Sequence, residues 1–208
     1  MSPRPRKASD EAVFAATQRV MARRGPGELA LAEIAAEAGV TAGALVQRFG
    51  SKRGLLLTAV ARWAEGAQAM LDGFRTERSS PLAALRHYAE CLAAMGETPG
   101  ALAHHLSYLQ MDLTDPDFRF HLQRNAQVTR AVFEEWLAEA VAQGELAPGT
   151  DTVTLARLVE ALIGGSLLSW AVHQDGAAAA RVARDLDALL APHRPVAATA
   201  ASGHPGSR

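Results

Sequence analysis

The sequence predicts an all-α protein, and three observations lead to this fold class. Alanine, leucine and other good helix formers dominate the chain. Runs of β-branched residues are few, and apolar residues recur at helical spacing between glycine and proline breaks. With 208 residues, the chain suits one or two domains and is long enough to bury a core.

The breaks divide the chain into nine expected helices. Ser9 or Asp10 is a suitable cap for the first, and Gly25-Pro26-Gly27 follows its end. Ser79-Ser80-Pro81, Asp115-Pro116 and Pro148-Gly149 mark later restarts. We expect helices over about 10–23, 31–38, 42–48, 51–78, 81–95, 100–112, 117–143, 152–174 and 177–191.

Residues 31–49 are the most informative segment. Leu31, Ile34 and Ala35 fall on one helical face, and Gly39 can end that helix in a left-handed conformation. Thr41 is a good cap for the next helix because its hydroxyl accepts from a free backbone N–H. Two helices joined by so short a turn have the layout of a helix-turn-helix, which places its second helix in the DNA major groove.

The exposed face of the second helix separates this interpretation from a helical hairpin without a DNA role. Small residues let a helix enter a groove, and Gln and Arg side chains recognise base edges or phosphates. The face is small or polar and lacks an acidic residue: Thr41, Ala42, Gly43, Ala44, Gln47 and Arg48.

The same segment resembles the DNA-binding domain of the tetracycline-repressor (TetR) family. The resemblance implies a dimeric, all-helical transcriptional regulator, usually a repressor that a small ligand releases from DNA. The residues that carry it are Ile34-Ala35, Ala38-Gly39-Val40-Thr41-Ala42-Gly43-Ala44-Leu45 and Phe49-Gly50-Ser51-Lys52-Arg53-Gly54-Leu55-Leu56.

Carried over by position, the resemblance implies that Lys52 meets a phosphate and that four residues meet bases or nearby backbone: Thr41, Gly43, Ala44 and Gln47. Val46 stands where the family commonly has a phosphate-binding Tyr, so we expect that contact either to be lost or to move to Arg48. Leu29 stands where the family commonly has a Thr that caps the helix over 31–38, so we expect Glu28 to cap that helix instead. The full set of expected DNA-contacting residues is Thr41, Ala42, Gly43, Ala44, Val46, Gln47, Arg48 and Lys52.

The charge distribution agrees with a DNA-binding amino-terminal part. The whole chain has a formal net charge of −1, but residues 1–53 hold nine Lys or Arg against five Asp or Glu. DNA affinity depends on local neutralisation of phosphates and not on total charge. Arg4, Arg6 and Lys7 form an arm that either reaches a minor groove or phosphates, or is an idle solvated tail.

The helix expected over 152–174 is apolar on nearly all sides, which a lone surface helix is not. Gly164 and Gly165 within it need a reason, since glycine costs a helix about 1 kcal/mol relative to alanine. Intimate packing within one monomer and a subunit interface both supply one. The family resemblance favours a homodimer through a four-helix bundle with the helix over 117–143. The expected interface residues are Val132, Trp136, Leu158, Leu162, Gly165 and Ser169.

The middle helices carry polar and soft side chains among apolar ones, which suits a small-molecule pocket and an ordinary core edge alike. The candidate ligand-binding residues are His87, Tyr88, Cys91, His104, Tyr108, Trp136 and Trp170, with Met95, His105, Met111 and Phe118 on the same or neighbouring helices. By family resemblance, an effector bound there shifts the helix over 51–78 and changes the spacing of the two recognition helices.

Other functional classes lack sequence support. We find no glycine-rich phosphate loop, metal-ligand spacing or nucleophile elbow, so we expect no enzyme, cofactor or metal. The single cysteine, Cys91, excludes an internal disulfide, and the sequence predicts neither a secretory signal nor a membrane span. The expected location is the bacterial cytoplasm, by resemblance. A helical interaction or scaffold protein without specific DNA binding remains the alternative.

We therefore expect three parts. Residues 1–53 form a helix-turn-helix domain with a basic amino-terminal arm. Residues 54–191 form a helical effector-binding and dimerisation domain, and residues 192–208 form a disordered tail.

Overall fold

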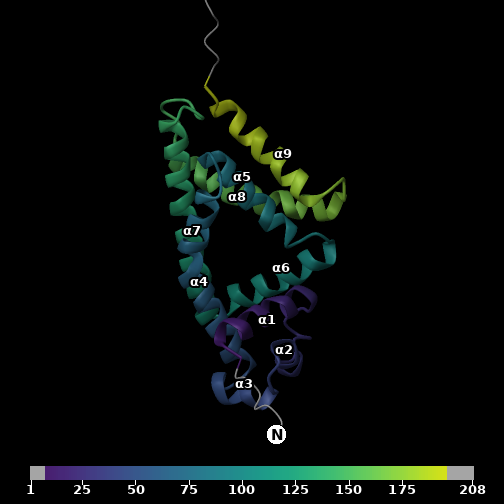
Figure 1. Ribbon diagram of the computed structural model, residues 1–208. Helices are drawn as coiled ribbons and strands as arrows, with labels where there is room; N and C mark the ends of the chain where they lie inside the picture. The colour runs from purple at the N-terminus through teal and green to yellow at the C-terminus, as the bar shows by residue number, and fades with distance from the viewer. Residues whose placement is uncertain (1–7, 196–208) are drawn as a thin grey trace, which may run out of the picture.

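The computed structural model describes residues 8–195, and this part of the chain is all-helical without a strand (Figure 1). The prediction of fold class is confirmed, and most helix ends fall within two residues of the expected positions. The helices are α1 (Asp10–Arg23), α2 (Leu31–Ala38), α3 (Ala42–Phe49), α4 (Lys52–Thr76), α5 (Pro81–Ala94), α6 (Pro99–Thr114), α7 (Pro116–Ala142), α8 (Thr152–His173), α9 (Ala178–Leu190) and the 3-10 turn η1 (Ala191–His193).

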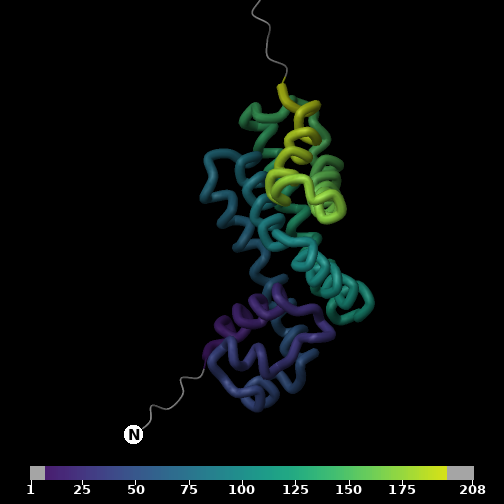
Figure 2. Tube along the Cα trace, turned by 90° about the vertical axis from the view of Figure 1, so that its right-hand side faces the viewer, coloured from purple at the N-terminus to yellow at the C-terminus, as the bar shows by residue number. Residues whose placement is uncertain are grey.

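The helices form two lobes. Helices α1, α2 and α3 make the lower lobe in Figure 1, and α5, α8 and α9 make the upper one. The long helices α4 and α7 pack against each other, and α6 crosses between the lobes and rests on α1 (Figures 1 and 2). The segment with the expected helix-turn-helix, α2 and α3, thus lies at one end of an elongated molecule (Figure 1).

Each lobe has its own hydrophobic core. The upper core draws on α4 to α9 and includes Phe133, Trp136 and Trp170. The lower core contains residues of α1 to α4 together with Tyr108 of α6 and Phe118 of α7. Because α6 and α7 contribute to the lower core, the two lobes are joined by packing and not by a flexible linker. The expected domain boundary at residue 53 stays a prediction; buried Leu55, Leu56 and Ala59 also belong to the lower core.

Side-chain caps begin most helices as the sequence predicts. Ser9 caps α1 through a 3.2 Å bond from Ala12 N–H, and Asp151 caps α8 through a 3.0 Å bond from Thr154 N–H. The prediction for α2 was wrong, because its cap position is Ala30, without a side-chain capping bond. Glu28 instead belongs to the preceding turn, where its backbone N–H donates to Gly25 O at 3.1 Å.

Helix α8 is long and apolar enough to cross a membrane by length and composition, a property that core helices share. It packs against α7 and α9, and Arg130 of α7 bonds to its Glu160 at 2.7 Å. One side of α8 thus belongs to the upper core, and the absence of a membrane span stays a prediction.

The two ends of the chain bear on further expectations. The arm residues Arg4, Arg6 and Lys7, and tail residues 196–208, lie outside the described residues. The first residues of the expected tail are ordered as part of η1, where the carbonyl oxygen of His193 accepts from Ala147 N–H at 2.7 Å.

Candidate functional site

The turn between α2 and α3 has the geometry that its sequence predicts. Gly39 adopts a left-handed conformation with φ 68° and ψ 32°. The N–H of Val40 donates to Ala35 O at 2.9 Å, which closes the end of α2. Thr41 then caps α3 by accepting from Ala44 N–H at 3.1 Å. These bonds hold α3 at a set angle to α2.

The junction of α3 with α4 is equally constrained. The Ser51 hydroxyl accepts from Gly54 N–H at 3.0 Å and caps α4. A Cβ atom on Gly54 would lie 2.1 Å from the carbonyl oxygen of Phe49, so only glycine fits there. Leu45 of α3 is fully buried in the lower core. The position of α3 is therefore fixed by its neighbours on both sides.

One face of α3 is open to solvent and holds the expected DNA-contacting residues. Thr41, Gly43 and Gln47 are exposed, and Val46 has 46% of its surface accessible. Ala42 and Ala44 are half-buried beside them. Helix α3 lies at the far end of the lower lobe, away from α5, α8 and α9 (Figure 1).

The two cations expected to meet phosphates are engaged within the protein. The Arg48 guanidinium bonds to the carbonyl oxygen of Ala8 at 2.8 Å and pairs with the Asp10 carboxylate. The Lys52 ammonium donates to the carbonyl oxygens of Pro26 and Leu29, at 3.2 and 3.0 Å. Lys52 thus ties the start of α4 to the loop before α2, and each cation has to share or exchange these partners to contact DNA.

Two further arginines of α1 clamp α2. The Glu37 carboxylate accepts from Arg19 at 2.7 Å and from Arg23 at 2.8 Å. These two bonds hold the pKa of Glu37 below its usual value, and the bond from Arg19 has the larger effect. Since α2 and α3 share the turn at Gly39, the clamp orients the recognition helix from behind.

A cavity of about 260 Å³ lies where the lobes join. Its walls come from α1, α4, α6 and α7, and they are mainly aromatic, aliphatic and thioether side chains. The lining residues are Met21, Leu56, Val60, Trp63, Ala64, His105, Tyr108, Leu109, Met111, Asp112, Phe118, His121, Leu122 and Asn125.

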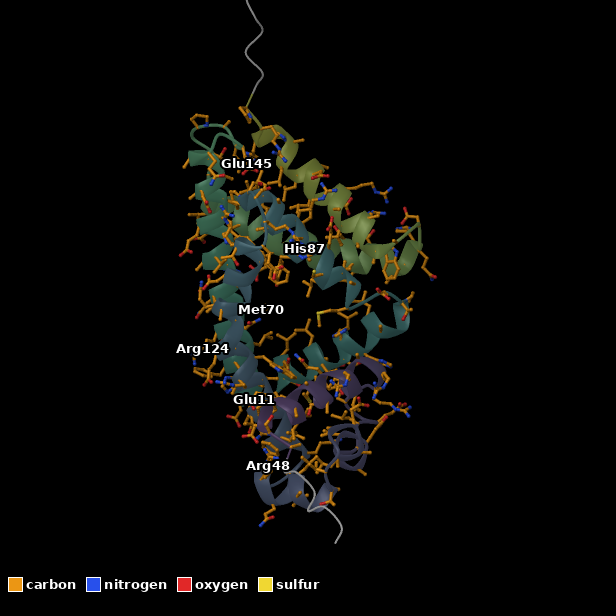
Figure 3. The ribbon with its side chains drawn as sticks, in the orientation of Figure 1. Glu11, Arg48, Met70, His87, Arg124 and Glu145 are labelled. Atoms are coloured by element: carbon orange, nitrogen blue, oxygen red, sulfur yellow. The ribbon has the colours of Figure 1, made fainter. Side chains whose placement is uncertain are left out.

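Only Tyr108 of the seven expected ligand-binding residues lines this cavity, so the structure does not bring that set together. Trp136 and Trp170 are buried in the upper core, and the Trp170 indole donates to Gly176 O at 2.8 Å. The remaining four lie elsewhere. His87, Tyr88 and Cys91 are on α5, where His87 and Tyr88 pack against Phe74; Figure 3 labels His87 in the upper lobe. His104 lies beside Gly25.

Helical spacing alone missed Trp63, Asp112 and His121 in this wall. Asp112 lies four residues after Tyr108, so the two share a face of α6. This spacing could have identified Asp112 as a neighbour of Tyr108 in the cavity wall. Trp63 and His121 are brought in by tertiary packing of α4 and α7, which the sequence of neither helix reveals. Among the described residues, no group of three or more His, Cys, Asp or Glu could hold a metal.

The expected dimer residues divide into two groups. The prediction that Val132 and Trp136 lie in the dimer interface was wrong, because both side chains face the upper core with at most 4% of their surface accessible. Leu158 and Gly165 of α8 are exposed, Leu162 is half-buried, and the Ser169 hydroxyl accepts from Arg181 at 3.2 Å.

Comparison with known proteins identifies both halves of the chain. The model for bacterial regulatory proteins of the tetR family matches residues 13–59. The model for the tetracyclin repressor-like C-terminal domain matches residues 107–186. No curated protein matches the sequence.

Solved structures share the fold. SmeT, the repressor of the SmeDEF multidrug efflux pump of Stenotrophomonas maltophilia, is 23% identical with a TM-score of 0.62, over 90% of this chain and 91% of SmeT. A TetR regulator from Haloarcula marismortui is 17% identical with a TM-score of 0.70, over 88% and 97% of the two chains. Bacillus subtilis FadR, solved with stearoyl-CoA, is 17% identical with a TM-score of 0.63, over 87% and 97%. Since a family model matches each lobe and the helices are arranged as in these structures, the chain belongs to the TetR family of bacterial transcriptional regulators.

Proposed function

We propose that the protein is a ligand-responsive repressor that binds a palindromic operator as a homodimer. The observation that carries DNA binding is the open face of α3, which lacks an acidic residue and is held by the Gly39 turn and the Thr41 cap. On this face Gln47 is the residue best suited to read a base edge, because a side-chain amide can bond an adenine in two places.

The exposed side of α8 supports the dimer. Leu158, Leu168 and Val172 expose 45%, 48% and 77% of their surfaces, at spacings that place them on one stripe. Between them, a side chain at Gly164 or Gly165 would meet no other element within 4 Å, so close packing inside the protomer does not explain the two glycines. A second copy of α8 crossing there does explain both the small and the apolar residues.

A two-fold axis at α8 gives each dimer two α3 helices, one at the far end of each protomer. Such pairs read half-sites in successive major grooves about 34–36 Å apart on one side of the duplex. The proposed operator is therefore palindromic, and the rotation that relates the protomers sets the spacing of its halves.

Ligand response is supported by the position of the junction cavity. Two of its lining residues contact the lower lobe directly: the Tyr108 hydroxyl donates to Arg24 O at 3.0 Å, and the Phe118 ring lies 5.5 Å from the Arg53 guanidinium carbon. A ligand that reshapes these walls changes how α6 and α7 hold the DNA-binding lobe. A coupling of about 1–3 kcal/mol changes operator affinity roughly 5–150-fold. SmeT, a repressor of similar fold, has also been solved with triclosan.

The test is fluorescence polarisation with the DNA upstream of the protein's own coding region, titrated at several salt concentrations. We expect tight binding that weakens as salt rises, because phosphate contacts release counterions. Gln47→Ala should change sequence preference, whereas Gln68→Ala, an exposed glutamine on α4, should not. Equal binding of all sequences by the unaltered protein would favour the scaffold alternative. A regulator of this kind acts in the cytoplasm, which we include in the proposal.

A further inference from the structure

The junction cavity has an unusual balance of polar and apolar groups. Three aromatic side chains line it, those of Trp63, Tyr108 and Phe118, together with the thioethers of Met21 and Met111. Neither Lys nor Arg is among its lining residues. The one carboxylate in the wall is Asp112.

Asp112 has no partner for its charge. Its Oδ1 atom is inaccessible to solvent and forms no hydrogen bond, and no cation among the described residues lies within ion-pair distance of it. Arg53, at the start of α4, is already engaged, since it bonds to Asp115 and Asp117. A half-buried carboxylate with one inaccessible, unpartnered oxygen is costly, so a positive group brought to this wall gains an ionic contact without displacing a resident one.

We propose that this cavity binds a lipophilic organic cation, with the charged nitrogen against Asp112 and the apolar body between the aromatic rings. The aromatic faces add to the attraction, because the electron-rich face of a ring draws a cation within about 6 Å of its centre. The site deepens the proposed function, on which its regulatory meaning rests, by naming the chemical class of the effector.

Other ligand classes fit this wall less well. An anionic ligand would bring a second negative charge to Asp112 and find no Lys or Arg in the lining. A neutral hydrocarbon would fill the volume but leave Asp112 unpaired. The Nδ1 atom of His121 also lacks a partner, and it offers a second polar contact on the α7 side.

The direct test is calorimetric titration of the full-length protein at pH 7.5, without DNA. The probe is benzyltrimethylammonium, and its control is neopentylbenzene, a neutral hydrocarbon of the same shape. We expect the cation to bind about tenfold more tightly than the hydrocarbon, as a desolvated charge contact should allow. Equal affinity for the two probes, or no binding of the cation, would overturn the proposal.

Variants locate the charge contact. Asp112→Asn keeps the shape and should remove the preference for the cation, whereas Asp112→Glu should retain it. Asp72→Asn, which removes an exposed carboxylate outside the cavity, is the matched control and should change nothing. Undiminished cation preference in Asp112→Asn would contradict the assignment. If Asp112→Asn does not fold, Asp112→Glu provides the test, and loss of the cation preference in Asp112→Glu would contradict the assignment.

Lowering the pH gives an independent check, because the probe carries a permanent charge. Burial, with a smaller effect from Asp115, raises the pKa of Asp112 to about 6, so affinity should fall as the pH drops below that value. His105 and Tyr108 of α6 and His121 of α7 are the other titratable groups in the wall. Asp112→Asn leaves these groups in place, so the part of the pH dependence that it removes belongs to Asp112. An unchanged profile in that variant would contradict the role of Asp112.

A polarisation titration with DNA separates this proposal from the proposed function. If the cation binds but operator affinity does not change, the site stands and its regulatory role fails. If the protein binds no DNA, the proposed function fails while the calorimetric result stands.

Discussion

The Tyr108 hydroxyl donates a 3.0 Å hydrogen bond to the carbonyl oxygen of Arg24, at the end of α1. This bond joins α6 to the DNA-binding lobe across 84 positions of sequence. Tyr108 is buried, and burial raises its pKa to about 12, so the hydroxyl stays a donor at neutral pH. The hydroxyl therefore keeps the proton that it donates to Arg24 O well above neutral pH.

Removing this bond should weaken the attachment of α6. Tyr108→Phe leaves the Arg24 carbonyl without its donor, and we expect a loss of about 1 kcal/mol in the free energy of unfolding. For a chain of this length, the melting temperature should fall by roughly 2–4 °C. Circular dichroism during heating measures the melting temperature, and Ser107→Ala on the same helix is the control. An unchanged melting temperature would show that the contact does not hold α6.

Gly54 should tolerate no side chain. Gly54→Ala places a methyl group against the carbonyl oxygen of Phe49, so α3 must move relative to α4. We expect loss of operator binding with most of the helical content retained. Gly66→Ala, also in α4 but with nothing within 4 Å of the new methyl group, should instead stabilise the protein by up to about 1 kcal/mol. Normal DNA binding by Gly54→Ala would contradict the geometry of this junction.

The proposed dimer predicts a response confined to α8. Leu168→Glu places a charge on the exposed stripe, and a buried unpaired charge should convert the dimer to monomers at micromolar concentration. Sedimentation velocity measures the outcome. Leu113→Glu changes a comparably exposed leucine on α6 and should leave the dimer intact. A persistent dimer in Leu168→Glu would place the interface elsewhere.

Asp112 should reduce stability at neutral pH. Its raised pKa means that the folded state holds the proton more tightly than the unfolded state, so its effect is favourable in acid and is lost as the pH rises through about 6. Asp112→Asn should accordingly raise the melting temperature by a few degrees at pH 7.5 and by less at pH 5. All other groups are the same in both proteins, so the difference between variant and parent isolates Asp112. A larger gain at pH 5 than at pH 7.5 would reverse the assigned sign.

Local rules predicted the DNA-binding lobe well. The Gly39 turn and the caps at Ser9 and Thr41 depend on residues within a few positions of one another, and the structure contains all three. Glu28 failed as a cap because α2 begins at Leu31, so the cap position is Ala30, two residues beyond Glu28.

Tertiary contacts explain what sequence patterns missed. Helical spacing showed that Val132 and Trp136 share an apolar face of α7, but that face contacts the protomer's own core and the interface side of α8 lies elsewhere. The junction cavity draws on four helices, so its composition depends on how α4 and α7 pack. No single helix carries that information in its own periodicity.

The Asp115 carboxylate joins the starts of two long helices. It accepts from Asp117 N–H at 3.0 Å, which caps α7, and from the Arg53 guanidinium at 2.9 Å, near the beginning of α4. We therefore expect a rotation of α7 to reach α4 at its DNA-proximal end as well as along its length. The recognition helix, which directly precedes α4, should then move with both long helices.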